Sequence, residues 1–253
     1  MLPKEHGAYG QLIFPMVTAL AIGRPSIAAL SVAAAAVFIF LAHEPLLVLL
    51  GQRGPRAARE RRGQALRWFI ACTTAAIALG ITALLAIEPS LRPTLAVPAA
   101  LAAVVVLLIV ARREHTTAGE IASAIALSSL AYPVSLASGA SPLGARTCAL
   151  VFASGFVAAT ICVRAVIANT RRPPAIDARG IGVLVAVFGI AALVSMAKNA
   201  VVTGIAPWAA APLATGGGVL AIAPPSARQL RRVGWTLVAT TAATSLVLVG
   251  ALR

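Results

Sequence analysis

Charge is scarce in this sequence, and acidic charge above all. Charged residues make up 11% of the chain, against roughly 25% in a soluble domain, which excludes an ordinary water-soluble protein. The seven acidic residues include a single aspartate, Asp177, so the chain has no aspartate-rich motif to hold a divalent cation. The three cysteines, Cys72, Cys148 and Cys162, form no CxxC pair. This argues against a disulfide framework or zinc knuckle and predicts buried packing residues.

Hydrophobic residues account for 60% of the chain, in runs long enough to cross about 30 Å of hydrocarbon. Because these runs are continuous rather than alternating, the expected fold class is all-α, a polytopic transmembrane helical bundle of about nine spans. The first span is expected to be retained rather than cleaved as a signal peptide, because Pro15 interrupts its apolar core. No linker is long enough for a second domain, so residues 1–253 are expected to form a single integral membrane domain. The spans are expected at residues 9–23, 28–50, 68–87, 94–111, 119–138, 146–168, 180–198, 206–223 and 234–252.

Basic residues are distributed unevenly between alternate connections. Sixteen of the 21 Lys and Arg fall on one side of the predicted bundle. The five on the other side are Arg24, Arg92, Arg146, Lys198 and Arg253. Cytoplasmic loops carry such an excess, which predicts a bacterial inner (plasma) membrane protein with a cytoplasmic N-terminus and a periplasmic or extracellular C-terminus. The lipid bilayer therefore accounts for the net charge of +14, and nucleic-acid binding is not expected.

The three histidines each stand directly beside a glutamate, in the pairs Glu5-His6, His43-Glu44 and Glu114-His115. Ionisable residues in or against a membrane are costly, so they are candidates for a functional site. All three pairs map to the predicted cytoplasmic side. On a helix, neighbouring side chains diverge by about 100°, so one member of each pair can face a common cavity.

Two of the candidate segments lie early in the chain. The opening, which includes Tyr9 and Gln11, is polar and glycine-punctuated, although a solvated tail would explain it too. His43 and Glu44 lie roughly 12 Å inside the second span. Pro45 removes a helical hydrogen bond there, and broken backbone at membrane depth is tolerated where it lines a cavity. The alternative is a structural salt bridge from Glu44 to an arginine on a neighbouring helix, for example Arg164.

Two further segments lie later. Residues 112–120 hold Glu114 and His115, although the stretch also fits a solvated loop in which Thr117 caps the next helix with Glu120. The end of the sixth span holds Arg164, Asn169 and Arg172, although an interfacial arginine that snorkels to water would explain the first of these.

The sequence leaves open whether the protein binds a metal ion. Three histidines would be the natural ligands, with the glutamates behind them. They lack the spacing of HxH or HxxxH motifs, so they do not identify a metal, and the cofactor is left unknown.

The opening Pro3-Lys-Glu-His-Gly-Ala-Tyr-Gly-Gln11, followed by Ala42-His-Glu-Pro-Leu-Leu47, resembles the YwiC-like family of bacterial membrane proteins. This resemblance implies a membrane location and no particular chemistry. In its predicted topology the chain is also loosely similar to the UbiA superfamily of membrane prenyltransferases. That likeness implies nine helices, with inner-face sites after the second and sixth spans. Two aspartate-rich motifs hold magnesium and a prenyl diphosphate in that superfamily, and both are missing from this sequence.

The favoured hypothesis is a UbiA-like bundle with a cytoplasm-facing polar cavity for an amphipathic, anionic, lipid-soluble molecule. If it is an enzyme, Glu44 or a histidine would transfer the proton, and Arg53, Arg164 and Arg172 would clamp the anion. The first alternative is a transporter with a His43 and Glu44 proton relay, and the second is an accessory subunit of a membrane complex. The full set of predicted site residues is Glu5, His6, His43, Glu44, Glu114 and His115 for catalysis, with Tyr9, Gln11, Arg53, Arg164, Asn169 and Arg172 for substrate.

Overall fold

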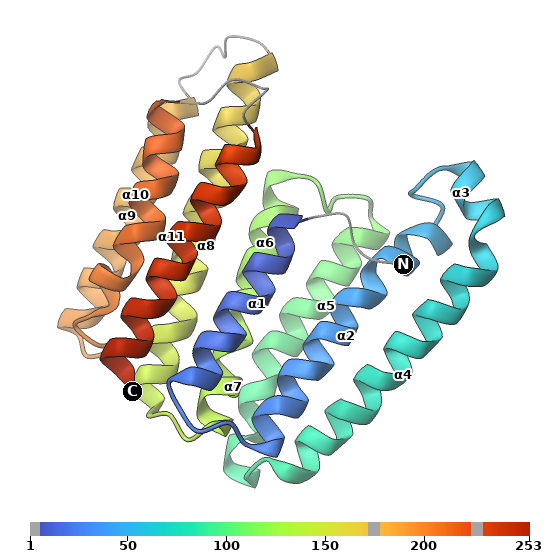
Figure 1. Cartoon of the computed structure of the whole chain (residues 1–253), viewed down its shortest axis with the longest axis horizontal. Coiled ribbons are helices and arrows are strands. Elements are labelled where there is room, and N and C mark those ends of the chain that lie inside the picture. The colour runs from blue at the N-terminus through green and yellow to red at the C-terminus, as the bar shows by residue number, and fades with distance from the viewer. Residues whose placement is uncertain (1–5, 172–177, 224–229) are drawn as a thin grey trace.

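The described part of the chain consists of helices and their connections (Figure 1), in a computed structural model. The structure describes the backbone of residues 6–171, 178–223 and 230–253, and the side chains of residues 7–167, 180–223 and 232–253. The first part comprises α1 (His6–Ala21), α2 (Ile27–Leu49), α3 (Pro55–Glu60), α4 (Arg62–Ala86), the 3₁₀ helix η1 (Pro89–Leu95) and α5 (Ala96–Val110). The rest comprises α6 (Thr117–Ser129), α7 (Ala131–Ala137), α8 (Pro142–Arg171), α9 (Ala178–Lys198), α10 (Ala206–Ile222) and α11 (Leu230–Leu252).

Seven helical stretches within the described residues are long and apolar enough to cross a membrane. They are Ile27–Leu49, Arg62–Ala86, Pro89–Val110, Thr117–Ala137, Pro142–Ile167, Gly180–Lys198 and Arg232–Leu252. The all-α, multi-pass membrane fold is therefore confirmed. The first and eighth predicted spans correspond to the shorter apolar helices Gly7–Ala21 and Ala206–Ile222, so a total of nine spans stays a prediction.

Prolines account for the main departures from the predicted spans. The span expected at 119–138 is divided at Leu130 into α6 and α7. Pro133 lies just beyond this break, and its ring clashes with the carbonyl four residues earlier. The span expected at 94–111 begins with η1, which contains Pro89 and Pro93. The sequence prediction missed α3, a solvated six-residue helix that begins at Pro55.

The helices differ in how much of their surface is buried, which separates an inner from an outer set. Half of the spanning stretch is buried in α2 and in α8, against 17% in α4, α9 and α11 and 11% in the η1–α5 span. Large apolar side chains on the outer helices are exposed, for example Leu85, Leu107, Phe188 and Leu246. Because lipid tails solvate such residues, the outer helices present the surface expected to face the bilayer.

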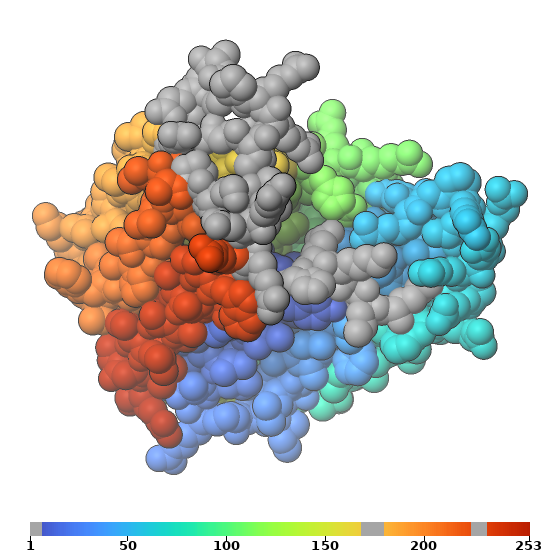
Figure 2. All heavy atoms as spheres, turned by 45° about the horizontal axis from the view of Figure 1, so that its top comes forward, coloured from blue at the N-terminus to red at the C-terminus, as the bar shows by residue number. Residues whose placement is uncertain are grey.

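The connections alternate between two ends of the bundle. The start of α1, the α2–α4 connection and the α5–α6 connection all lie at the end shown uppermost in Figure 1, and the C-terminus lies at the other. Figure 2 looks obliquely onto the upper end, where the green α5–α6 connection lies beside the blue residues that follow α2. This end carries the site described next.

Candidate functional site

Helix α2 delivers His43 and Glu44 to this end without a break. The helix runs from Ile27 to Leu49 with Pro45 inside it, so the predicted break in the helix at Pro45 is wrong. Leu47 and Val48 are 1% and 3% exposed, and this packing holds the last turn despite the hydrogen bond that Pro45 removes. His43 and Glu44 are thus presented by regular helix, with side chains 18% and 9% exposed.

Glu44 forms a two-point ion pair with Arg53 from the loop that follows its own helix. Arg53 Nε lies 3.0 Å from Glu44 Oε1, and the second guanidinium nitrogen lies 2.5 Å from Oε2. Gly51, with a φ of +71°, turns the chain so that Arg53 comes back over the helix end. The predicted partner of Glu44, Arg164 on a neighbouring helix, is therefore wrong. A residue nine positions away reaches Glu44 first.

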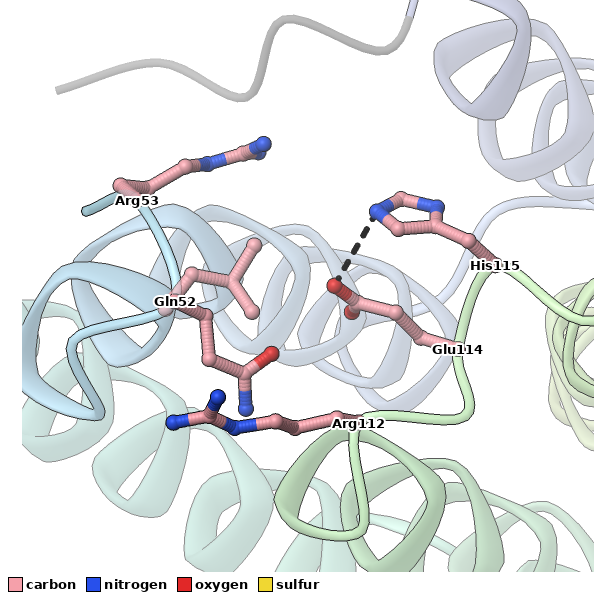
Figure 3. Close-up of a pocket in the computed structure, with 6 residues that line it drawn as sticks. Gln52, Arg53, Arg112, Glu114 and His115 are labelled. Atoms are coloured by element: carbon pink, nitrogen blue, oxygen red, sulfur yellow. Dashed lines mark ion pairs between the residues drawn. The ribbon is translucent and has the colours of Figure 1, made fainter.

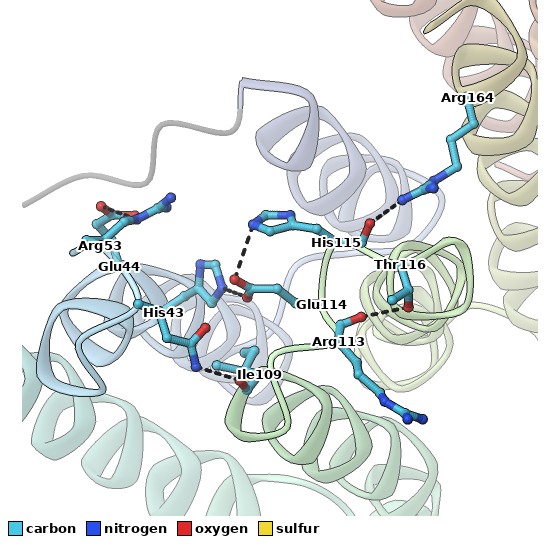
Figure 4. A network of polar contacts seen from close by, with 10 residues as sticks. His43, Glu44, Arg53, Ile109, Arg113, Glu114, His115, Thr116 and Arg164 are labelled. Carbon is cyan, nitrogen blue, oxygen red and sulfur yellow. Dashed lines mark hydrogen bonds and ion pairs between the residues drawn. The ribbon is translucent and has the colours of Figure 1, made fainter. Parts of the chain in front are cut away.

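Glu114 lies between two histidines (Figure 4). Its Oε2 is 3.0 Å from His43 Nε2, and its Oε1 is 3.3 Å from His115 Nε2. The carboxylate is 11% exposed and His115 is 64% exposed, so the array reaches from an accessible imidazole to a largely buried one. The sequence prediction that these residues share one end is borne out for His43, Glu44, Glu114 and His115.

The α5–α6 connection is folded tightly enough to hold Glu114 in place. Thr116 caps α6, because its hydroxyl accepts from the Gly119 backbone N–H at 3.1 Å. The predicted cap, Thr117, is wrong by one residue. A Cβ on Gly119 would lie 2.3 Å from the Arg113 carbonyl oxygen and 2.6 Å from that of Glu114. Only glycine therefore lets this loop pack onto the start of α6.

Arg164 fastens the same loop from α8. Its Nε donates to Glu120 Oε2 at 2.6 Å, and a terminal nitrogen of the guanidinium donates to the His115 carbonyl. The ion pair joins α8 to α6, while the second bond holds the backbone beside Glu114 (Figure 4). Arg164 is thus a cross-link between helices rather than a residue that lines the pocket.

A pocket of about 190 Å³ opens beside these groups and is lined by Leu47, Gln52, Arg53, Arg112, Glu114 and His115. In Figure 3, Arg53 and Arg112 lie on either side of Gln52, with Glu114 and His115 across from them. Gln52 is fixed by its Nε2, which donates to the Ile109 carbonyl at 2.7 Å. Arg112 makes no ion pair within the described residues, so its charge is available to a ligand.

The sequence prediction missed Gln52 and Arg112 as pocket residues. Arg112 has a φ of +56°, in the left-handed region that favours glycine. Nothing in the sequence marks a non-glycine residue for that conformation. It turns the chain at the end of α5 and places Arg112 against the pocket, and strained backbone of this kind gathers at functional sites.

The remaining predicted site residues divide into two groups. Tyr9 packs edge-on against Phe40 with ring centroids 5.0 Å apart, on the α1 side of the site. Gln11 is half-buried in α1 and is not among the residues that line the pocket. The side chains of Glu5, His6, Asn169 and Arg172 lie outside the described residues.

Within the side chains that the structure describes, no group of three or more His, Cys, Asp and Glu could hold a metal ion. His43 and His115 each direct Nε2 to Glu114, at 3.0 and 3.3 Å. The third histidine of the expected facet, His6, has its side chain outside the described part.

The site falls within the part of the chain that a family comparison recognises. The family model described as YwiC-like protein matches residues 2–136, more than half of the chain. The chain belongs to the YwiC-like family. Every pocket residue lies inside the matched segment, whereas Arg164 lies beyond it. No curated protein and no solved structure matches the chain.

Proposed function

We propose that this YwiC-like protein binds the anionic head of an amphipathic, lipid-soluble molecule in the pocket and exchanges a proton with it. One observation carries the proposal: Glu114, which lies between two imidazoles, lines the same pocket as Arg53 and Arg112. Guanidinium groups attract and orient anionic oxygens. A carboxylate hydrogen-bonded to imidazoles is suited to accept or return a proton.

The groups have separate roles in this proposal. Glu44 does not line the pocket, and both of its oxygens accept from the Arg53 guanidinium, so it orients the arginine rather than transferring the proton. Glu114 contacts both the pocket and the histidines, and it takes over the role first expected of Glu44. His115 is exposed and connects Glu114 to water, while His43 supports the carboxylate from α2. Histidine is suited to this role because its charge changes near neutral pH.

The orientation belongs to the same proposal. The pocket lies at the end to which the connections rich in arginine map, and such connections face the cytoplasm. The site would therefore open at the cytoplasmic surface of the bacterial plasma membrane. A UbiA-like arrangement would share the basic end as the location of the site. The pocket, however, lies where α2, the second span, and α5, the fourth span, end, and the described part of α8, the sixth span, contributes no lining residue. No magnesium–diphosphate step is proposed.

The second candidate is a transporter in which the same array relays protons. What favours it is that one end of the array is exposed and the rest is largely buried, with His115 64% exposed, Glu114 11% and His43 18%. Such a path leads from solvent into the bundle, as proton relays in membrane proteins do. An accessory subunit of a membrane complex has no comparable observation in its favour.

Reconstituted protein distinguishes these candidates. Mass spectrometry of lipids retained by the purified protein should identify an anionic amphiphile that is lost in Arg112→Gln and kept in Arg113→Gln. Arg113 is the matched control because it is the adjacent arginine and its side chain points away from the pocket in Figure 4. Chemical conversion of the retained molecule supports an enzyme, and uptake into liposomes that depends on a pH gradient supports the transporter. Equal retention by wild type and Arg112→Gln would contradict the proposed site.

A further inference from the structure

The size of the pocket limits what can enter it. Its volume of about 190 Å³ is below the roughly 300–1,000 Å³ of pockets that enclose whole drug-sized ligands. A compact polar group fits, and the remainder of an amphipathic molecule must lie outside. Gln52 lines the pocket and donates a hydrogen bond to the Ile109 carbonyl, so the pocket adjoins the end of α5. The outer surface of α5 is apolar and exposed.

The lining combines two kinds of charge, which restricts the chemistry of that group further. Arg112 has no ion-pair partner among the described residues, and Arg53 shares its charge with Glu44. Both guanidinium groups attract anionic oxygens of a ligand. Glu114 faces the same space and accepts hydrogen bonds, so the ligand must also supply a proton donor.

We propose that the pocket binds a phosphomonoester in its singly protonated form, an inference that rests on the function proposed above. The ionised oxygens accept hydrogen bonds from Arg112 and Arg53, and the remaining P–OH donates to Glu114. Arginine matches phosphate geometry better than lysine does, because its fork presents two parallel N–H donors. Proton exchange then requires no other reactant: the P–OH proton moves to Glu114, and the phosphate gains one negative charge beside the arginines.

Other common headgroups satisfy only part of this lining. A phosphodiester offers anionic oxygens but no P–OH, and a carboxylate bound to arginine has no proton left to donate. A quaternary ammonium group would face two guanidinium groups. A phosphate dianion would be repelled by Glu114, which is 11% exposed and therefore weakly screened.

Binding to the full-length protein in nanodiscs tests this selectivity. The probes are phosphatidic acid as a lipid phosphomonoester, phosphatidylglycerol as an anionic phosphodiester, a fatty acid as a carboxylate, and inorganic phosphate. Phosphatidic acid should bind about tenfold more tightly than phosphatidylglycerol, the worth of one hydrogen bond to a charged group. Glu114→Gln should remove this preference, Arg112→Gln should weaken the binding of both lipids, and Arg113→Gln should change neither. Displacement of phosphatidic acid by inorganic phosphate at matched concentration would assign the site to soluble phosphomonoesters, whereas no displacement assigns it to lipids.

The pH dependence gives a second readout. A phosphomonoester loses its last proton near pH 6, so binding of phosphatidic acid should weaken between pH 5 and pH 8. The titratable and charged groups that line the pocket are Arg53, Arg112, Glu114 and His115. Behind them, His43 contacts Glu114 and Glu44 contacts Arg53. Phosphatidylglycerol, which has no second ionisation, reports the contribution of the histidines over the same range. Glu114→Gln should remove the extra pH dependence of phosphatidic acid and strengthen its binding at pH 8.

The outcomes separate this inference from the proposed function. Equal affinity for phosphatidic acid and phosphatidylglycerol, with both lost in Arg112→Gln, would overturn the phosphomonoester and leave the anion site standing. Binding that is indifferent to Arg112 for every probe would overturn both. An unchanged pH profile in Glu114→Gln would show that the carboxylate does not contact the ligand and would overturn the assignment of the P–OH.

Discussion

Glu114 joins His43 on α2 to its own neighbour His115, with His43 Nε2 3.0 Å from one carboxylate oxygen and His115 Nε2 3.3 Å from the other. His43 and Glu114 are 71 residues apart in sequence, so the contact fixes the α5–α6 connection against the end of α2. The same contact places a proton acceptor beside Arg53 and Arg112.

Glu44→Gln should lower stability by about 1–3 kcal/mol, because it removes the charge that pairs with Arg53 and weakens two hydrogen bonds. Arg53 is 29% exposed and can turn toward water, which keeps the loss below that of a fully buried pair. Thermal melting in detergent measures the change. The double variant Glu44→Gln with Arg53→Gln should cost less than the sum of the single variants. Strict additivity would mean that the pair does not interact.

Gly119→Ala should displace the loop that carries Glu114, because its Cβ would approach the Arg113 carbonyl oxygen to 2.3 Å. We expect lower thermal stability and loss of ligand binding. Gly63→Ala is the control, since nothing lies within 4 Å of its Cβ position. Alanine should stabilise α4 there by roughly 0.5–1 kcal/mol. Normal ligand binding by Gly119→Ala would show that the loop position does not matter.

Arg164→Gln should release the α5–α6 connection from α8. The variant loses the ion pair to Glu120 and the bond to the His115 carbonyl. Hydrogen exchange of residues 111–116 should become faster, while exchange in α10 stays unchanged. Arg164→Lys should restore exchange only in part, because lysine lacks the fork that reaches two acceptors at once. Equal protection in wild type and Arg164→Gln would remove Arg164 from this positioning role.

Reporter fusions test the orientation. Fusions after Arg67 and Arg179 should report the cytoplasm, and a fusion at Ser141 should report the periplasm. The reason is that 16 of the 21 Lys and Arg residues map to the side of the bundle that carries Arg67 and Arg179. A periplasmic signal after Arg67 would reverse the bundle and place the pocket on the outer face.

The sequence predicted the fold class and that His43, Glu44, Glu114 and His115 lie at the same end of the bundle. It did not predict the contacts within the site. Apolar run length is a strong local signal, which is why the seven long spans and two shorter apolar helices lie where they were expected. Partner choice depends on turns instead. Arg53 returns to Glu44 because Gly51 adopts a positive φ, and Arg112 reaches the pocket through a left-handed backbone that arginine seldom adopts. The sequence does not show which acidic residue at that end pairs with Arg164. The packing of α8 against α6 places Arg164 beside Glu120.

Infrared difference spectroscopy of Glu114 on ligand binding is the most direct test of proton exchange at this site. When phosphatidic acid is added to the reconstituted protein, a protonated-carboxyl band should appear in the wild type. It should be absent in Glu114→Gln and present in Glu60→Gln, since Glu60 is exposed and paired with Arg56 on α3. A band that persists in Glu114→Gln, or no band in the wild type with ligand bound, would contradict the account.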